Sequence, residues 1–388
     1  MIQAVLAGSS ALFGLDDIAG SLASVGIDAV FAEAPVMIRG RTLSESDTRR
    51  TVITSALPAC DIAIALSEYW VSRLASSHQL AVSKRALAAS RSKRLLYELL
   101  SPCAVVPHVF IGQQDALAYI RSGAQVVVKP DGLFAGYGVK VVGEHNACDL
   151  ATHIHNAAHL SNHATKVCAL KGGEALVCQW LEGIEYSADV FVRQGAAHVV
   201  RVCRKVVALV HDTPCALVYQ LVDISEQMTC AISRWCGALF DASDVCFAQL
   251  DYIATASGEL VPIDFAPRVG GALLPLLATY CEATSQNVFA RAISGGRYVA
   301  TCSSDEGEKL YWTQLNSVAR KSGLLCRDDF PLPEGKHFIY KRVGDFVPRC
   351  PSSAQSTIAS TVDKHRWPVD SGTLLSLFVP DEYIRPPE

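Results

Sequence analysis

Two acidic residues, Asp251 and Asp264, flank a turn in the stretch "VCFAQLDYIATASGELVPIDFAPR". The runs on either side are rich in β-branched and aromatic residues, which predicts two strands that turn at Ser257-Gly258. A hairpin centred there places the aspartates opposite one another, and cross-strand neighbours have Cβ atoms about 4.5–5.5 Å apart. Two carboxylates this close repel each other unless a cation lies between them, and their oxygens suit Mg²⁺. We therefore predict a magnesium site on this hairpin.

Arg268 and the pair Gly270-Gly271 follow directly after the second strand. A guanidinium pairs well with carboxylates and phosphates, and glycine lets a ligand approach the backbone. This combination predicts a docking point for an anionic group of a substrate.

A lysine and a glycine-spaced loop lie between two β-rich runs in "QVVVKPDGLFAGYGVKVV". The pairing is typical of phosphate binding, but neither common phosphate loop fits. A Walker loop needs Gly-Lys-Ser/Thr at the start of a helix, whereas Lys129 precedes the glycines. A dinucleotide fingerprint needs a glycine three residues after Gly138, where the chain has Val141 in a predicted strand. The residues alone leave the role of this loop open.

The first ninety residues alternate strand-like and helix-like runs. "IQAVLAG", "DAVFAEAP" and "CDIAIALS" read as strands, and "ALFGLDDIAGSLASVG" reads as a helix. This alternation predicts a parallel sheet covered by helices. Residues 83–100 read as helical with a break near Ser90, and Leu96, Leu99 and Leu100 would face inward.

Longer strands with tight turns predominate farther along the chain. "EALVCQWLEG", "IEYSADVFVRQG", "AAHVVRVCRKVVAL" and "CALVYQLVD" predict an antiparallel array with turns at Gly183 and Gly195. A helix is predicted at "SEQMTCAISRWCGALF", with an apolar stripe of Met228, Ile232, Trp235 and Leu239. A last helix is predicted at "LLPLLATYCEATSQNVFARAI", before ninety Pro-rich, irregular residues.

In this order the pieces resemble the ATP-grasp superfamily, and within it the carboxylate–amine ligases of the amino-acid ligase type. The resemblance covers nearly the whole chain. It implies an α/β and α+β multidomain architecture, with an N-terminal Rossmann-like pre-ATP-grasp domain followed by a two-lobed ATP-grasp fold. The implied domains are residues 1–90 for the first, 91–182 for a small lobe with a glycine-rich flap, and 183–388 for a large lobe with the metal site and a C-terminal extension.

The resemblance also implies a set of residues that bind the nucleotide. Two lysines match the family's ATP-binding lysines, a loop matches its mobile flap over the phosphates, and "VCQWLEGIE" matches the hinge that presents backbone groups to adenine and an acid to the ribose. The two lysines are Lys93 and Lys129. The flap runs from Asp131 to Gly138 and includes Gly136 and Tyr137. In the hinge, Gln179, Trp180 and Leu181 would present backbone groups to adenine, and Glu185 would bind the ribose.

The remaining matches concern the metal and the chemistry. Asp251 and Asp264 resemble the magnesium ligands, Lys205 a third phosphate-facing basic residue, and Arg268 the residue beside the acyl phosphate. The commonest motif on the last strand is Glu-x-Asn-x-Arg, whereas this chain has a shorter acid and Ala266 in place of the asparagine. Alanine cannot ligate a metal, which puts the second magnesium in doubt.

The activity that the resemblance implies uses ATP and Mg²⁺, with Mn²⁺ as a possible substitute. It activates a carboxylate as an acyl phosphate and condenses it with an amine, with amino acids as substrates in peptide, siderophore or other natural-product biosynthesis. Two alternatives stay open. One is a carboxylase-type or purine-pathway ATP-grasp ligase, and the other is a catalytically degenerate nucleotide-binding scaffold.

The composition of the chain limits the class of protein and the kinds of partner to expect. Half of the 388 residues are hydrophobic and the net charge is −4, which favours a buried core and, without a basic stripe, argues against a nucleic-acid partner. No run reaches the ~20 apolar residues of a membrane span. "MIQAVLAGSS" lacks the features of a secretory signal, and the 14 cysteines show no Cys-x-x-Cys spacing. We expect buried cysteines in a reducing cytoplasm, small-molecule carboxylate and amine substrates, and a homodimer as one assembly that the resemblance allows.

Three further features invite a chemical interpretation. His155, His159 and His163 share one face of a predicted helix, where such spacing can bind Zn²⁺ or Ni²⁺. A solvated helix face is the more ordinary interpretation. A general base for the amine is not evident, and His211 or Asp212 are the candidates. We expect the loops 8–14, 209–217 and 268–275 to shape the substrate pockets.

Overall fold

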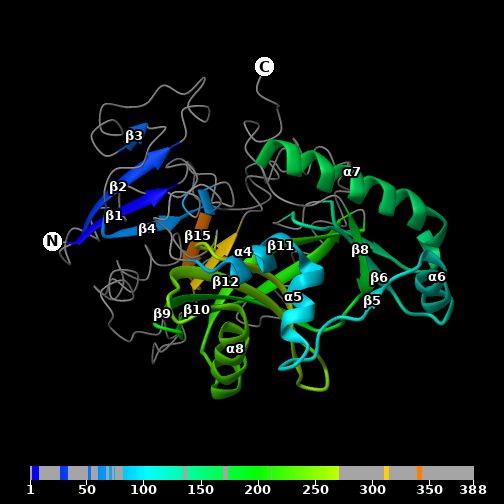
Figure 1. Cartoon of the computed structure of the whole chain (residues 1–388). Coiled ribbons are helices and arrows are strands. Elements are labelled where there is room, and N and C mark those ends of the chain that lie inside the picture. The colour runs from blue at the N-terminus through cyan, green and yellow to red at the C-terminus, as the bar shows by residue number, and fades with distance from the viewer. Residues whose placement is uncertain are drawn as a thin grey trace, which may run out of the picture.

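The computed structural model describes residues 2–7, 27–33, 51–53, 60–66, 70–71, 74, 82–133, 138–168, 174–210, 212–270, 310–313 and 339–342. Within these ranges the strands form three sheets, and helices pack against them (Figure 1).

The first sheet contains the N-terminal strands β1 (Ile2–Ala7), β2 (Ile27–Glu33), β3 (Thr51–Ile53) and β4 (Ile62–Ala65). Their order is β3-β2-β1-β4 and every neighbouring pair is parallel. The parallel pairing agrees with the prediction from the sequence. The helix predicted between β1 and β2 lies outside the described residues, so the Rossmann-like domain stays a prediction.

Two short helices follow, α4 (Lys84–Arg91) and α5 (Lys93–Leu100). The predicted break falls at Ser92, whose backbone is extended and whose side chain caps α5 by accepting from the amide of Leu95. Leu96 and Leu100 are buried and Leu99 packs against the same core, as the sequence predicted.

The second, small sheet has the antiparallel order β5-β8-β6-β7. Its strands are β5 (Val109–Phe110), β6 (Val126–Pro130), β7 (Lys140–Val142) and β8 (Ala175–Gln179), and its helices are α6 (Gln113–Arg121), the 3-10 helix η3 (Glu144–Asp149) and α7 (Leu150–Cys168). The strand that ends before Gly183 was predicted in the long antiparallel array. It belongs to the small sheet instead, because β8 pairs with β5 and β6.

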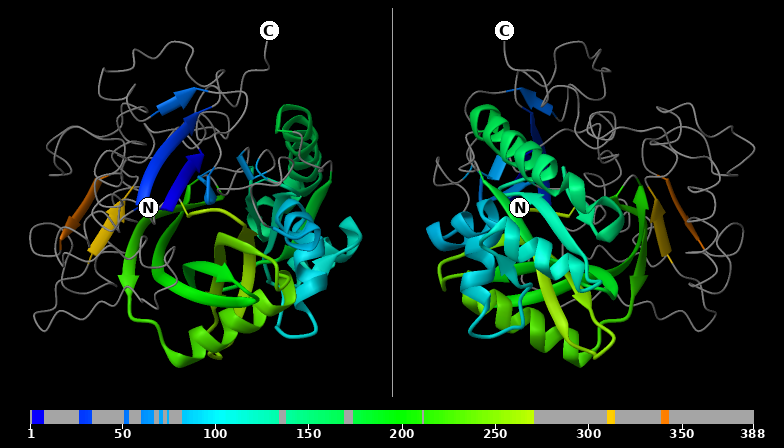
Figure 2. Two further views of the ribbon diagram at one scale, coloured as in Figure 1. Left: turned by 60° about the vertical axis from the view of Figure 1, so that its left-hand side comes forward. Right: turned by 90° about the vertical axis from the view of Figure 1, so that its right-hand side faces the viewer.

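The third, large sheet has the order β13-β12-β9-β10-β11-β14-β15 and is antiparallel throughout. Its strands are β9 (Ile184–Arg193), β10 (Ala196–Val210), β11 (Thr213–Val222), β12 (Val245–Ala254), β13 (Leu260–Ala266), β14 (Leu310–Thr313) and β15 (Ile339–Arg342). Helix α8 (Glu226–Leu239) lies along this sheet, while α7 lies along the small one (Figure 2). The helix predicted after residue 272 lies outside the described residues.

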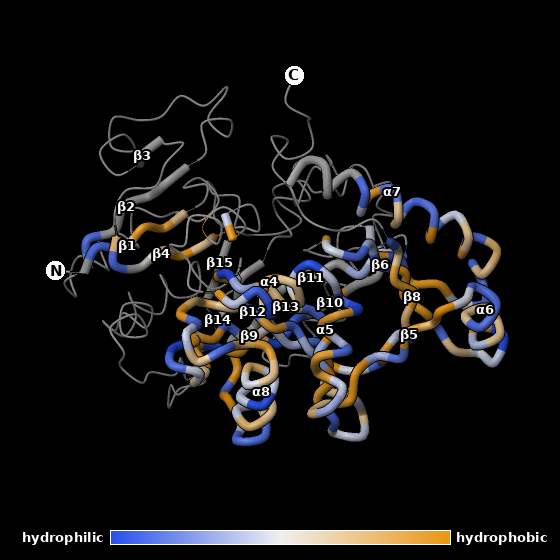
Figure 3. The backbone as a smooth tube through the Cα atoms, viewed as in Figure 1, coloured by the Kyte–Doolittle hydropathy of each residue, from blue (hydrophilic) through white to orange (hydrophobic). Residues whose placement is uncertain are grey.

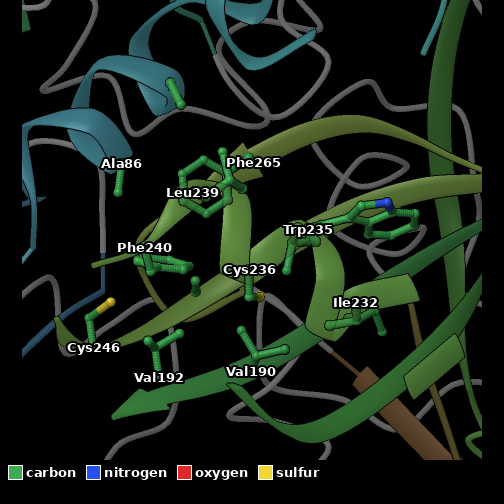
Figure 4. Packing of buried hydrophobic residues seen from close by; sticks show 14 of the residues in the cluster. Ala86, Val190, Val192, Ile232, Trp235, Cys236, Leu239, Phe240, Cys246 and Phe265 are labelled. Atoms are coloured by element: carbon green, nitrogen blue, oxygen red, sulfur yellow. The ribbon is translucent and has the colours of Figure 1, made fainter. Parts of the chain in front are cut away.

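The main core forms between α8 and one face of the large sheet (Figure 4). Successive strand residues point to opposite faces, and hydrophobic residues alternate with polar ones along these strands (Figure 3). We call the side toward α8 the apolar face; it comprises Ala188, Val190, Val192, Ala248, Leu250 and Tyr252. The predicted stripe of α8 meets it, with Ile232, Trp235 and Leu239 fully buried and Met228 at the margin.

Among the described residues, no helix is long and apolar enough to cross a membrane.

Candidate active site

The two predicted metal acids are direct cross-strand partners, Asp251 on β12 and Asp264 on β13. The register near the turn is different, because Tyr252 pairs with Pro262 and leaves Ile263 as an extra residue on β13. This extra residue is a β-bulge. Without it Asp251 would face Ile263, and Asp264 would point to the apolar face. The hairpin argument therefore reached the right pair through a register that only the bulge provides.

The side of the large sheet opposite α8 carries the other polar residues. We call it the polar face; it comprises Glu185, Ser187, Asp189, Arg201, Lys205, Gln249, Asp251 and Asp264. These residues alternate along the strands with those of the apolar face. The same four strands therefore build the core on one side and the candidate site on the other.

Lys205 joins two acids of the polar face. Its Nζ lies 2.7 Å from Glu185 Oε1 and 2.5 Å from Asp251 Oδ2. Burial raises the pKa of Asp251, but the charge of Lys205 and hydrogen bonds from Lys205, Ser187 and Gln249 outweigh burial and hold that pKa below its ordinary value. Asp251 is therefore ionised at neutral pH. Glu185, which the sequence assigned to the ribose, here contacts Lys205.

Gln249 connects Asp251 to Arg268. Its Nε2 donates to Ser187 Oγ at 2.9 Å and to Asp251 Oδ1 at 3.0 Å, and its Oε1 accepts from Arg268 Nη1 at 2.9 Å. Sequence analysis missed Gln249 and Ser187. Strand periodicity could have found Gln249, because a residue two positions before Asp251 shares its face.

A buried ion pair holds the segment after β13. Asp189 and Arg201 contact each other, and neither side chain is exposed. Burial raises the pKa of Asp189, although Arg201 and the Gly270 amide oppose this. That amide donates to Asp189 Oδ1 at 2.6 Å, and a Cβ at Gly270 would lie 2.8 Å from the same oxygen. The backbone access that the sequence suggested at Gly270 is thus used by the protein's own carboxylate, and Gly271 lies outside the described residues.

Lys93 lies at the start of α5 and faces the acid of β13. Its Nζ is 3.2 Å from Asp264 Oδ1 and donates to the carbonyl of Leu133 at 2.5 Å. Only 9% of its side chain is exposed. Each metal acid therefore has a lysine beside it: Lys93 for Asp264 and Lys205 for Asp251.

Asp131, which the sequence assigned to the nucleotide, caps α5. Its Oδ1 accepts from the backbone amide of Lys93 at 2.6 Å, and its Oδ2 accepts from Ser92 Oγ at 2.8 Å. Its carbonyl accepts from Ser161 of α7. A carboxylate at a helix N-terminus is stabilised by the free amides there. Asp131 thus anchors the first residues of the flap to the helix that carries Lys93.

The far end of the flap is anchored by packing. Gly138 has φ +65°, and a Cβ there would lie 2.6 Å from Leu160 Cδ1. Residues 134–137, which include Gly136 and Tyr137, lie outside the described residues.

Lys129 ends β6 on the small sheet and is buried. Its Nζ lies 3.4 Å from Tyr97 Oη, and Tyr97 Oη donates to the carbonyl of Ile263 at 3.0 Å. Tyr97 is a third residue that sequence analysis missed, although it stands one helical turn after Lys93.

The predicted hinge lies at the end of β8. The amides of Gln179 and Trp180 donate to the carbonyls of His108 and Gln125, at 2.9 and 3.0 Å. Backbone groups for adenine would therefore come from the carbonyls of this segment and from Leu181.

The histidine prediction is confirmed only in its helical spacing. Helix α7 contains all three histidines, and His155 and His159 are exposed. Of the candidate bases, His211 lies outside the described residues. Asp212 lies at the tip of the β10–β11 hairpin with φ +63°. Its carbonyl accepts from the Val141 amide at 2.7 Å, which joins this hairpin to the small sheet.

The described cysteines are free thiols, and four of them, Cys178, Cys203, Cys236 and Cys246, are buried. The expectation of buried cysteines is wrong for Cys148 and Cys230, which are exposed. Burial raises the pKa of Cys236 to about 12 and that of Cys246 well above its ordinary value. These two thiols are therefore unreactive core residues, as the sequence predicted.

Comparisons with known proteins identify the arrangement. Residues 122–275 match the family model of the ATP-grasp domain. No curated protein sequence matches the chain significantly.

Solved structures show the same fold over most of the chain. An L-amino acid ligase from Bacillus licheniformis is 14% identical with a TM-score of 0.56, over 94% of this chain and 98% of that one. An N5-carboxyaminoimidazole synthase from Aspergillus clavatus is 12% identical with a TM-score of 0.55, over 94% and 98%. The biotin carboxylase domain of a 2-oxoglutarate carboxylase from Hydrogenobacter thermophilus is 13% identical with a TM-score of 0.56, over 81% and 74%. At these identities the likeness concerns the fold alone.

Proposed function

We propose that this chain, whose residues 122–275 match the ATP-grasp domain, is an ATP-dependent ligase of the ATP-grasp superfamily that activates a carboxylate and condenses it with an amine. The observation that carries this proposal is the set of paired charges on the polar face. Asp251 and Asp264 are cross-strand partners, and each has a lysine beside it, Lys93 at Asp264 and Lys205 at Asp251.

The donor set suits a divalent cation. Two carboxylates on neighbouring strands need positive charge between them, and in this structure Lys93 and Lys205 supply it. Asp251 and Asp264 would hold Mg²⁺, or Mn²⁺ in its place, because hard cations take carboxylate oxygens. When bound, the metal would neutralise the charge on the phosphate oxygens. Lys93 and Lys205 would then be available to the phosphates.

The reaction consists of two substitutions. In the first, an oxygen of the substrate carboxylate forms a bond to the γ-phosphorus of ATP while the bond from that phosphorus to the β-bridging oxygen breaks. The products are an acyl phosphate and ADP. In the second, the amine nitrogen forms a bond to the acyl carbon, the bond to phosphate breaks, and the nitrogen loses a proton to a base.

The protein residues act by positioning and charge. Lys93, Lys129 and Lys205 would hold the phosphates, and Arg268 would bind the carboxylate and then the acyl phosphate. The flap 131–138 would exclude water, which otherwise hydrolyses the acyl phosphate. The hinge at Gln179–Leu181 would hold adenine.

Ala266 is the main argument for an inactive scaffold. Its cross-strand partner is Gln249, whose carboxamide bonds to Asp251 and Arg268. A carboxamide is therefore available at this level of the sheet from the neighbouring strand. This favours an active ligase over an inactive nucleotide-binding scaffold.

We extend the proposal to the organisation of the chain. Residues 1–90 form a Rossmann-like domain, 91–182 the small lobe, and 183–388 the large lobe with its extension. The substrates belong to the amino acids, in line with the resemblance of the sequence, and the assembly is a homodimer.

A substrate screen tests the function. ADP release is measured with Mg·ATP and pools of amino acids, small carboxylic acids or bicarbonate, and mass spectrometry identifies the condensed product. We expect amino-acid-dependent ADP release. Release that requires bicarbonate would instead support the carboxylase alternative, and nucleotide binding without turnover would support the scaffold.

Two variants test the residue assignment, Lys129→Ala and Asp264→Ala. Each should lower turnover by about 10²–10³-fold, the range for losing one preorganised charge in an active site. Lys84→Ala, which removes an exposed lysine of α4, is the matched control and should leave turnover unchanged. Full turnover in Asp264→Ala would exclude the proposed metal site.

A further inference from the structure

Tyr97 connects the two walls of the proposed nucleotide site. It stands one helical turn after Lys93, so both side chains share one face of α5. Its ring is 3% exposed and belongs to the main core. Its Oη donates to the carbonyl of Ile263 at 3.0 Å and accepts from Lys129 Nζ at 3.4 Å.

The bond to Ile263 acts on the bulge that orients Asp264. Ile263 is the extra residue of β13, and among the described strands β13 lies at one edge of the large sheet. A bulge residue stands outside the regular ladder pairing, and the carbonyl of the half-buried Ile263 takes its hydrogen bond from a side chain on another element. Tyr97 provides that side chain. The bond therefore favours the register in which Asp264 points to the polar face.

The bond from Lys129 reaches the other wall. Lys129 belongs to the small sheet, whereas Tyr97 packs in the core of the large one. Because Tyr97 donates its proton to Ile263, a lone pair of its oxygen is directed at the ammonium of Lys129. Burial raises the pKa of Tyr97 well above its ordinary value, with help from Cys178, Asp264 and Asp131. The hydroxyl thus keeps its proton, and both bonds persist at neutral pH.

We propose that Tyr97 is a positioning residue that sets Lys129 and Asp264 at the separation a metal-bound polyphosphate requires. This inference rests on the proposed function, because it assigns a role within the same nucleotide site. Tyr97 acts through these two residues and touches no reacting atom.

Nucleotide binding by the full chain tests it with the Tyr97→Phe variant. Phenylalanine keeps the buried ring, so the variant should fold, and thermal unfolding checks this. Dissociation constants are measured by calorimetry for ADP with Mg²⁺ and for AMP. ADP should bind about 3- to 10-fold more weakly, the equivalent of one hydrogen bond. AMP, which lacks the β-phosphate, should bind within about twofold of wild type.

Two comparisons sharpen the test. Tyr252→Phe is the matched control, because Tyr252 is equally buried but lies on the apolar face, and it should change neither constant. A double-mutant cycle then combines Tyr97→Phe with Lys129→Ala. If Tyr97 acts through Lys129, then Tyr97→Phe should weaken ADP binding less in the Lys129→Ala background than in the wild-type background.

The outcomes separate the two proposals. Wild-type protein that binds no Mg·ADP would overturn the proposed function and this inference with it. Wild-type binding together with an unchanged constant in Tyr97→Phe would overturn this inference alone. Equal weakening of ADP binding and AMP binding would also overturn this inference, because it would reflect a general loss of structure. Fully additive effects of the two substitutions in the double-mutant cycle would overturn it as well.

Discussion

The two faces of the large sheet are built from the same strands but carry different side chains around the candidate site. The apolar face packs against α8 and excludes water, with Leu250 and Val190 fully buried. The polar face carries ion pairs such as Lys205 with Asp251 and a chain of hydrogen bonds through Gln249. Consecutive residues of β12 alternate between them. Adjacent residues of one strand therefore serve different purposes. A substitution on the apolar face should lower stability, and a substitution of the next residue, on the polar face, should lower activity.

The largest effect is expected on the apolar face. Leu250→Ala removes a fully buried side chain and should lower the free energy of unfolding by about 2–5 kcal/mol. Chemical denaturation measures this. Turnover per folded molecule should stay close to wild type, and a specific loss of turnover without destabilisation would contradict the division between the faces.

The next residue should behave in the opposite way. Asp251→Asn keeps the shape of the side chain but removes the charge that pairs with Lys205. We expect the rate of ADP release to fall by about 10²–10³-fold. The midpoint of thermal unfolding should move by only a few degrees, because Lys205 keeps its ion pair with Glu185. Steady-state kinetics over a magnesium series provide the measurement. Wild-type turnover in this variant would remove Asp251 from the site.

A smaller effect is expected at Gln249, which orients groups without carrying charge. Gln249→Leu removes its hydrogen bonds to Asp251 and Arg268 and should lower kcat/KM about tenfold, the equivalent of one or two hydrogen bonds. The loss should be larger in KM for the carboxylate than in KM for ATP, because Arg268 is assigned to the carboxylate. An effect confined to ATP would contradict that assignment.

The smallest effect is expected at Tyr252. Within the described part of the chain its buried hydroxyl has no hydrogen-bond partner, so Tyr252→Phe removes an unsatisfied polar group. The free energy of unfolding should stay constant or rise by up to about 1 kcal/mol, as equilibrium denaturation would report. A clear loss of stability would mean that this hydroxyl has a partner.

Much of the candidate site could be predicted because its signals are local. Strand periodicity and a tight turn placed Asp251 and Asp264 close together on neighbouring strands, although their direct pairing depends on the bulge at Ile263. The phosphate role of Lys129 and the glycine-spaced loop stays a prediction. The contacts of Asp131 could not be predicted, because its partner is the N-terminus of α5, nearly forty residues away. The ion pair of Asp189 with Arg201 was missed for a different reason, because two charged residues in neighbouring strands look like solvated ones until their burial is known.

The sequence by itself determined the alternation along β9 and β12, and with it which side chains can share a face, because that period is a property of the extended backbone. It could not determine the register. A shift of the β12–β13 pairing by one residue would point the Asp264 side chain into the core. The bulge at Ile263 prevents this shift, and the Ile263 carbonyl accepts a hydrogen bond from Tyr97, which stands on a helix more than 160 residues earlier. Only the packing of that helix against β13 brings the Tyr97 hydroxyl to the Ile263 carbonyl and so favours the register with the bulge.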